Sequence, residues 1–204
     1  MSVGLHHLII VPILLPLLAG AVMLLLEERR RRIKAGLNLL VTLAQVGVAA
    51  LLLRQVHGGN PEIGVYLLGN WPAPFGIVLV LDRLSALLLL LASVLALASL
   101  LFALARWHRA GPHFHPLFQF LLVGINGAFL TGDLFNLFVF FEVMLAASYG
   151  LVLHGSGTTR VKAGLHYIAV NLASSLLFLI GVALIYGATG PLQSASNLHI
   201  ASQK

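Results

Sequence analysis

The stretch TGDLFNLFVFFEVMLAASYG, residues 131–150, decides the fold. Beyond Asp133 it contains a single charged residue, Glu142, and most of its other residues are apolar. A helix that crosses the hydrocarbon core of a bilayer needs about 20 such residues. The stretch therefore predicts a transmembrane helix that carries one carboxyl group in its interior.

The composition of the whole chain agrees with this prediction. Of the 204 residues 59% are hydrophobic and 9% are charged, whereas about 25% of the residues of a soluble domain are charged. A soluble enzyme is excluded, and the lipid bilayer is the expected surrounding. The net charge of +6 does not indicate nucleic acid, because the basic residues form short clusters between apolar stretches. The absence of cysteine excludes disulfides and thiolate metal sites.

Charged and Gly/Pro-rich breaks divide the chain into apolar spans. The predicted fold class is all-α: a polytopic membrane protein with about six transmembrane helices within residues 1–190 and an atypical, disordered tail at 191–204. The predicted spans are 8–26, 33–53, 77–105, 114–131, 134–153 and 163–188.

Basic residues predict the orientation, because Lys and Arg gather in short cytoplasmic loops. They follow the first, third and fifth spans, at 29–34, 106–109 and 160–162. The N-terminus is therefore expected outside. Residues 57–75 are then external, and within them 63–68 are expected to form a short strand or hairpin arm.

Glu142 is the principal candidate site residue. It lies nine residues after Asp133, which is about 13–14 Å along a helix and near the middle of a bilayer. A carboxyl group at that depth is costly unless it is paired, hydrated or protonated, so it is a functional hypothesis by default. A hydrogen bond that serves helix packing alone is the alternative reading.

His166 is the second candidate, since histidine titrates near physiological pH. It lies one turn deeper in the membrane than Lys162 and is either a proton relay towards Glu142 or an interfacial residue. Polar and aromatic residues recur further along the same helix, which favours helix packing over a hydrated path. They are Tyr167, Asn171, Ser174, Ser175 and Phe178.

The remaining polar residues favour structural roles. Asp133 is expected to cap its helix, and Asp82 is expected to cap a helix or to pair outside the chain. The pairs His6–His7 and His113–His115 have no accompanying carboxylate or cysteine, so no metal site is predicted. We expect no cofactor, since no phosphate-binding loop or hydrolase motif is present.

Residues 131–150 resemble the fifth helix of the D subunit of the Mrp-type multisubunit sodium/proton antiporters. Two further stretches resemble the same protein, residues 71–87 at the entry to the third helix and residues 163–171 in the sixth. The family is related to the proton-pumping membrane subunits of respiratory complex I. The resemblance runs from the start to about residue 190.

This resemblance implies that Glu142 takes part in proton translocation, with a lysine on a seventh helix as its partner. The sequence departs from the pattern of this family in two ways. His166 stands where lysine is more usual, and the chain ends after six of about fourteen helices. The tail is read as the product of a frameshift, a premature stop or a gene fragment, with a short paralogue as the alternative.

Three functions follow as hypotheses. The first is a transporter subunit, not an enzyme, of a monovalent cation/proton antiporter in a prokaryotic cell membrane, with other hydrophobic subunits as partners and protons and monovalent cations as the transported ions. The second is a proton-pumping subunit of a complex I-like quinone oxidoreductase or a membrane-bound hydrogenase. The third is a fragment that is inactive in transport.

Overall fold

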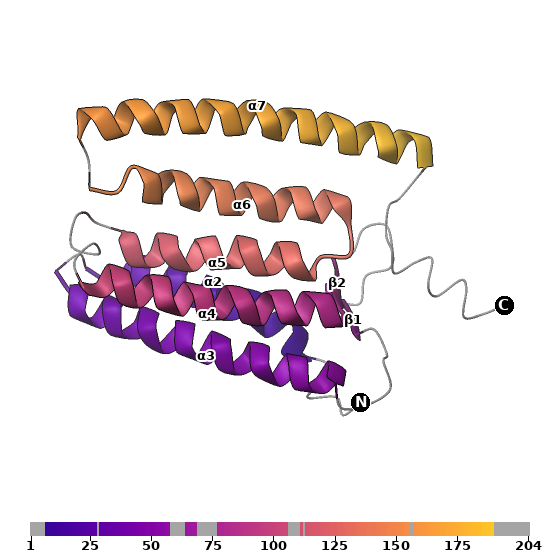
Figure 1. Ribbon diagram of the computed structural model, residues 1–204, viewed down its shortest axis with the longest axis horizontal. Coiled ribbons are helices and arrows are strands. Elements are labelled where there is room, and N and C mark those ends of the chain that lie inside the picture. The colour runs from indigo at the N-terminus through magenta and orange to yellow at the C-terminus, as the bar shows by residue number, and fades with distance from the viewer. Residues whose placement is uncertain are drawn as a thin grey trace.

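The protein is a bundle of membrane-length helices with a small β-hairpin at one end (Figure 1). The computed structural model describes residues 7–27, 29–57, 64–68, 77–105, 111, 113–155 and 157–189. The elements in chain order are η1 (His7–Ile10), α2 (Val11–Leu25), α3 (Arg31–His57), β1 (Gly64–Leu67), β2 (Val78–Leu81), α4 (Arg83–Ala105), α5 (Phe114–Leu130), α6 (Leu134–Val152) and α7 (Thr158–Thr189). The predicted tail at 191–204 lies outside the described residues.

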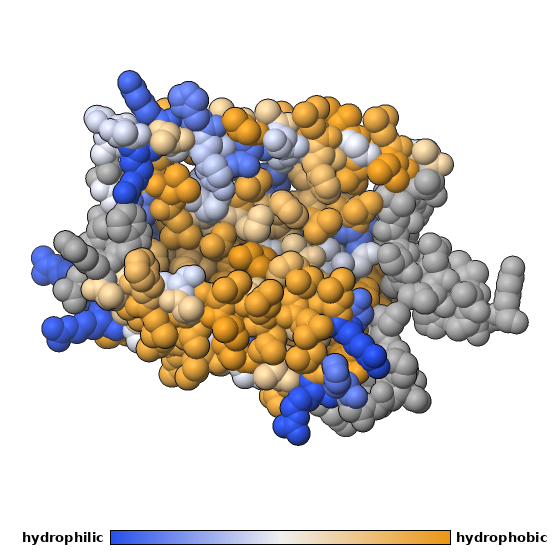
Figure 2. All heavy atoms as spheres, viewed as in Figure 1, coloured by the Kyte–Doolittle hydropathy of each residue, from blue (hydrophilic) through white to orange (hydrophobic). Residues whose placement is uncertain are grey.

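The prediction of about six membrane helices is confirmed. Among the described residues, five helical segments are long and apolar enough to cross a membrane: η1 with α2, then α3, α4, α6 and α7. The sixth, α5, is apolar but has 17 residues. Apolar side chains cover the middle of the molecule, and hydrophilic ones gather towards its ends (Figure 2).

The predicted third span was wrong at its start. Residues 78–81 form β2, which pairs antiparallel with β1 in the register Gly64↔Leu81 to Leu67↔Val78. The short run Val78–Leu81 suits a strand because β-branched residues alternate in it. The expected hairpin arm at 63–68 is confirmed as β1, whereas its partner strand was missed.

Asp82 ends the strand and begins α4. Its carboxylate accepts a hydrogen bond from the Ser85 backbone N–H at 2.6 Å, and the Ser85 hydroxyl accepts one from the Asp82 N–H at 2.9 Å. These reciprocal bonds satisfy backbone donors that have no partner within the helix. The expected capping role of Asp82 is confirmed, and the Ser85 N–H bond lowers the pKa of this carboxyl group below its usual value.

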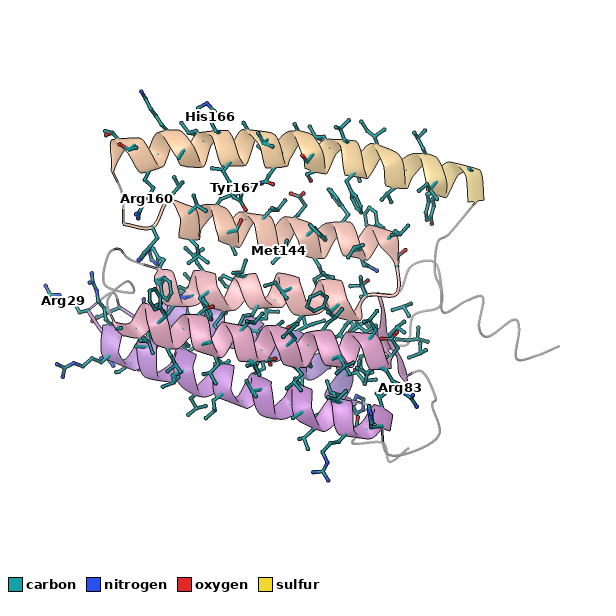
Figure 3. All side chains as sticks on the ribbon, viewed as in Figure 1. Arg29, Arg83, Met144, Arg160, His166 and Tyr167 are labelled. Carbon is teal, nitrogen blue, oxygen red and sulfur yellow. The ribbon has the colours of Figure 1, made fainter. Side chains whose placement is uncertain are left out.

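The two ends of the bundle differ. At the hairpin end, the Gly132 N–H donates to the Val78 carbonyl at 2.9 Å, which ties the α5–α6 turn to β2. We call the opposite end the basic end, because Arg29 and Arg160 lie there (Figure 3). The turn between α2 and α3 and the starts of α3 and α7 add Arg30–Arg32, Lys34 and Lys162 to it. Helices α2 to α5 pack against one another, α6 packs on α5, and α7 packs mainly on α6 (Figure 1).

A buried polar network joins α3 to α5. The Gln119 amide donates to Asn38 Oδ1 at 2.6 Å and to the Thr42 hydroxyl at 3.1 Å. Asn38 Nδ2 lies 2.9 Å from His115 Nδ1. All four side chains are buried. In lipid such groups must find partners within the protein, and they therefore fix the register of the two helices.

The same interface repairs a defect in α2. Pro16 has no N–H, so the carbonyl of Pro12, four residues earlier, receives no helical donor. Gln45 of α3 donates to that carbonyl at 2.7 Å, and Asn126 of α5 donates to it at 2.8 Å. One carbonyl released by proline thus links three helices.

Candidate functional site

Glu142 lies in the middle of α6. The helix begins after Asp133, whose carboxylate accepts a hydrogen bond from the Asn136 N–H at 3.0 Å. The expected capping role of Asp133 is confirmed. Glu142 follows nine residues later, about 13 Å along the axis, and its side chain is half-buried.

The Glu142 carboxyl group faces α7. Its Oε1 accepts a hydrogen bond from the Ser175 hydroxyl. On the hairpin side of this contact, the rings of Phe138 and Phe141 stack on Phe178, each with a centroid distance of 6.3 Å. The carboxyl group therefore lies within the seam between two membrane-length helices, beside an aromatic stack.

On the basic-end side of Glu142 the seam carries hydroxyl groups. The rings of Tyr149 and Tyr167 meet edge to face with centroids 5.8 Å apart. The Ser148 hydroxyl lies 3.2 Å from the Tyr167 hydroxyl. The Tyr149 hydroxyl is buried and has no hydrogen-bond partner among the described residues.

His166 does not meet Glu142. It is exposed on the side of α7 away from α6, whereas Tyr167 and Arg160 project towards α6 (Figure 3). Its Nδ1 lies 2.9 Å from the Lys162 carbonyl of its own helix. A role for His166 as a proton relay stays a prediction, and it has no direct contact with the carboxyl group it was expected to serve.

The predicted stripe on α7 divides in two. Tyr167, Ser175 and Phe178 contact α6. Asn171 and Ser174 instead donate to carbonyls of their own helix, four residues earlier. The first three therefore build the seam, and the other two add nothing to it directly.

The structure describes His7, His113 and His115 of the two histidine pairs. Within the described ranges, no group of three or more His, Cys, Asp or Glu is placed to hold a metal ion. His115 lies in the first turn of α5 and is buried against Asn38. His7 lies 3.3 Å from the Tyr66 hydroxyl, and His6 is outside the described residues.

The polar network of α3 and α5 was missed in the sequence. A usable signal exists, because Asn38, Thr42 and Gln45 follow helical spacing, as do His115, Gln119 and Asn126. Lys34, expected in a loop, lies in the first turn of α3 and begins the same buried stripe. A single polar residue in a membrane helix does not show which neighbouring helix it faces, so only the two facing stripes identify the interface.

The family described as NADH:quinone oxidoreductase/Mrp antiporter, TM, matches residues 131–203, which include α6, α7 and most of the tail. The resemblance drawn from the sequence alone stopped at about residue 190, so the match extends further than expected.

Two curated relatives are similar over nearly the whole chain. The D subunit of a probable K⁺/H⁺ antiporter of Rhizobium meliloti is 64% identical over 198 residues, covering 96% of this chain and 37% of the relative. The D subunit of the Na⁺/H⁺ antiporter of Alkalihalophilus pseudofirmus is 42% identical, covering 94% of this chain and 38% of the relative. The chain thus spans less than two fifths of the length of these relatives.

Solved structures show the same fold. The Mrp complex from Dietzia sp. DQ12-45-1b matches with a TM-score of 0.84 and 38% identity, over 95% of this chain and 36% of that one. An archaeal respiratory complex, the membrane-bound sulfane sulfur reductase, matches with a TM-score of 0.80 and 30% identity, over 91% of this chain and 38% of that one.

The fold, the intramembrane glutamate and these matches define a class: the antiporter-type membrane subunits shared by Mrp antiporters and respiratory complexes. Within this class the chain corresponds to the N-terminal part of the Mrp-type D subunit. It is a multi-pass membrane protein, and in bacteria the membrane concerned is the plasma membrane.

Proposed function

We propose that this chain supplies an intramembrane proton site, Glu142, to a multisubunit monovalent cation/proton antiporter. The observation that carries the proposal is the Glu142 carboxyl group in the α6–α7 seam, hydrogen-bonded to Ser175. A carboxyl group that is half-buried at mid-membrane depth can exist in both protonation states when a neighbouring helix supplies a hydroxyl donor. Loading and release of a proton is the chemistry that such a site supports.

The antiporter function is supported by the curated relatives, which are named as D subunits of K⁺/H⁺ and Na⁺/H⁺ antiporters. The resemblance supplies the expected partner of Glu142, a lysine on a seventh helix, which lies past the six helices described for this chain. A carboxylate and a lysine in contact titrate as a coupled pair. Coupled titration of this pair is the step by which we expect Glu142 to drive exchange.

The assembly is also part of the proposal. We infer that the chain works with other hydrophobic subunits, acts as a transporter subunit and not as an enzyme, and lies with its basic end in the cytoplasm. His166 then lies near the cytoplasmic surface, where it can collect protons without touching Glu142.

The direct test is Glu142→Gln in an antiporter complex that carries this sequence, reconstituted in vesicles. Glutamine keeps the size of the side chain and a hydrogen-bond acceptor for Ser175, but it cannot take up and release a proton near neutral pH. We expect proton-coupled cation exchange to be lost while the complex still assembles. Glu27→Gln is the matched control, because Glu27 is exposed near the basic end. Exchange at the parental rate with Glu142→Gln would contradict the proposal.

A redox complex is the second candidate, favoured by the match to the archaeal respiratory complex. Purification in mild detergent distinguishes the two functions. Small hydrophobic subunits alone indicate an antiporter, whereas iron–sulfur or flavin subunits that co-purify indicate a respiratory enzyme.

A further inference from the structure

The seam between α6 and α7 changes character at Glu142. The two helices run antiparallel, so the contacts follow one another along the seam in order. Towards the hairpin end comes the aromatic stack on Phe178, and towards the basic end come the hydroxyls of Ser148, Tyr149 and Tyr167. The surroundings of the carboxyl group are therefore apolar on one side and polar on the other.

Tyr149 carries one of the hydroxyl groups on the polar side of Glu142. It follows Glu142 by seven residues, which places both on one face of α6 with Tyr149 about 10 Å nearer the basic end. Its ring meets the Tyr167 ring of α7, with the two centroids 5.8 Å apart. A phenol can donate and accept a hydrogen bond, and the described residues give this buried hydroxyl neither.

The opposite face of α6 offers no such groups. There Phe140 and Met144 pack against Gly127 and Gly124 of α5, and Leu117 packs against Gly150. Met144 points into this contact, away from α7 (Figure 3). In the part of the chain that the structure describes, the polar connection from Glu142 towards the basic end therefore runs along α7.

We propose that the Tyr149 hydroxyl, with Tyr167 behind it, transfers protons between Glu142 and the basic end, and that the Phe178 stack closes the seam towards the hairpin end. Tyr149 passes its proton through a bridging water to a Glu142 oxygen, while its own oxygen takes a proton from the Tyr167 hydroxyl. Tyr167 is reprotonated in turn by a hydrated proton from the basic end. The phenol is neutral before and after the step, and the reverse sequence releases the proton. This inference rests on the proposed function of Glu142, and it adds that protons reach Glu142 from the basic end of the seam.

The test follows the protonation of Glu142 directly. Protons are released by light from a caged compound on one side of vesicles that contain the complete complex in one orientation. The infrared band of the protonated Glu142 carboxyl group reports the arrival of the proton. This band is assigned by its absence in Glu142→Gln. In Tyr149→Phe, which keeps the ring, we expect protonation from the basic end to slow about 100-fold, the lower range for a positioned proton-transfer group.

Three further variants complete the experiment. Tyr167→Phe should slow the same step by a smaller factor, and Tyr186→Phe, exposed near the other end of α7, should leave it unchanged. Phe178→Ser should let Glu142 respond to protons released on the hairpin side. Parental rates in both Tyr149→Phe and Tyr167→Phe would overturn the inference. Loss of the band without loss of antiport in Glu142→Gln would instead overturn the proposed function.

Discussion

Helices α2 to α5 and the pair α6–α7 use polar residues in different ways. For an apolar 18-residue stretch of each helix, the share buried within the chain is 39% in η1–α2 and 33% in α3. In α6 and in α7 the buried share is only 6%. The polar residues shared by α2, α3 and α5 bond to one another and to the freed Pro12 carbonyl. The α6–α7 seam holds a carboxyl group with one hydroxyl donor and a tyrosine hydroxyl that has no hydrogen-bond partner among the described residues.

Under the proposed function, this difference separates a scaffold from the region that holds the proton site. The buried network of α2, α3 and α5 favours one arrangement of helices, because a shift would break several of its hydrogen bonds in lipid. The side-chain oxygens of Gln45 and Gln119 have no hydrogen-bond partner among the described residues. The large exposed apolar surface of α7 suits contact with lipid or with further membrane helices.

The largest expected effect comes from breaking the contact between the two regions. A Cβ added at Gly124 would lie 2.6 Å from both the backbone nitrogen and the Cβ of Met144, so α6 must move away from α5. Gly124→Ala should therefore destabilise the protein by about 1–3 kcal/mol. At Gly47 a Cβ meets nothing within 4 Å, and Gly47→Ala should stabilise α3 by up to about 1 kcal/mol. Thermal unfolding of purified complexes that carry each variant compares their stabilities. An equal loss of stability in both variants would contradict the close packing of α5 on α6.

A smaller effect is expected at the cap of α4. Asp82→Ala removes the bond to the Ser85 N–H and should cost about 1 kcal/mol at neutral pH. The folded-state pKa of Asp82 is lowered below the usual 3.8, so its contribution is complete above that pH and is lost as the pH falls through the folded value. Unfolding measured from pH 6 downwards should show the parent and Asp82→Ala converging below pH 3.8. Glu27→Ala, which removes an exposed carboxylate, should show no such convergence.

The smallest effect concerns the bond that repairs α2. Gln45→Leu removes one donor to the Pro12 carbonyl, whereas Pro16→Ala restores a helical N–H to it. The two substitutions should therefore couple, with Gln45→Leu costing less in the Pro16→Ala background. The coupling energy should be about 0.6 kcal/mol, the average for interhelical hydrogen bonds in membranes. A double-mutant cycle on thermal stability measures this coupling energy. If the effects of the two substitutions on stability add strictly, the Gln45 donor does not compensate for the N–H that Pro16 lacks.

Much of the fold follows from local sequence. The apolar runs predict the membrane helices, and Asp133 is recognised as a cap from its place before one of them. The start of the third span was misplaced because Val78–Leu81 is as apolar as the helix that follows, so hydropathy cannot tell strand from helix there. Pairing with β1 decides it.

The candidate site was predicted in part. Glu142 is visible in the sequence because a charge in a long apolar run is costly wherever the helix packs. The association of His166 with Glu142 was inferred from its depth and from the chemistry of histidine, and neither shows which side of α7 the residue occupies. Ser175 was identified as one of a stripe, and only the packing of α7 on α6 selects it as the donor to Glu142.

The sequence by itself determined that the chain lies in lipid, that it crosses the membrane about six times, and that one carboxyl group lies deep within a span. These conclusions depend on the solvation cost of each segment, which is a property of local composition. Only the tertiary structure decided which polar groups meet: the α3–α5 network, the repair of the Pro12 carbonyl, and the hydroxyl and aromatic sides of Glu142. The physical reason is that partners on different helices are selected by helix rotation and close packing, which depend on the whole bundle at once.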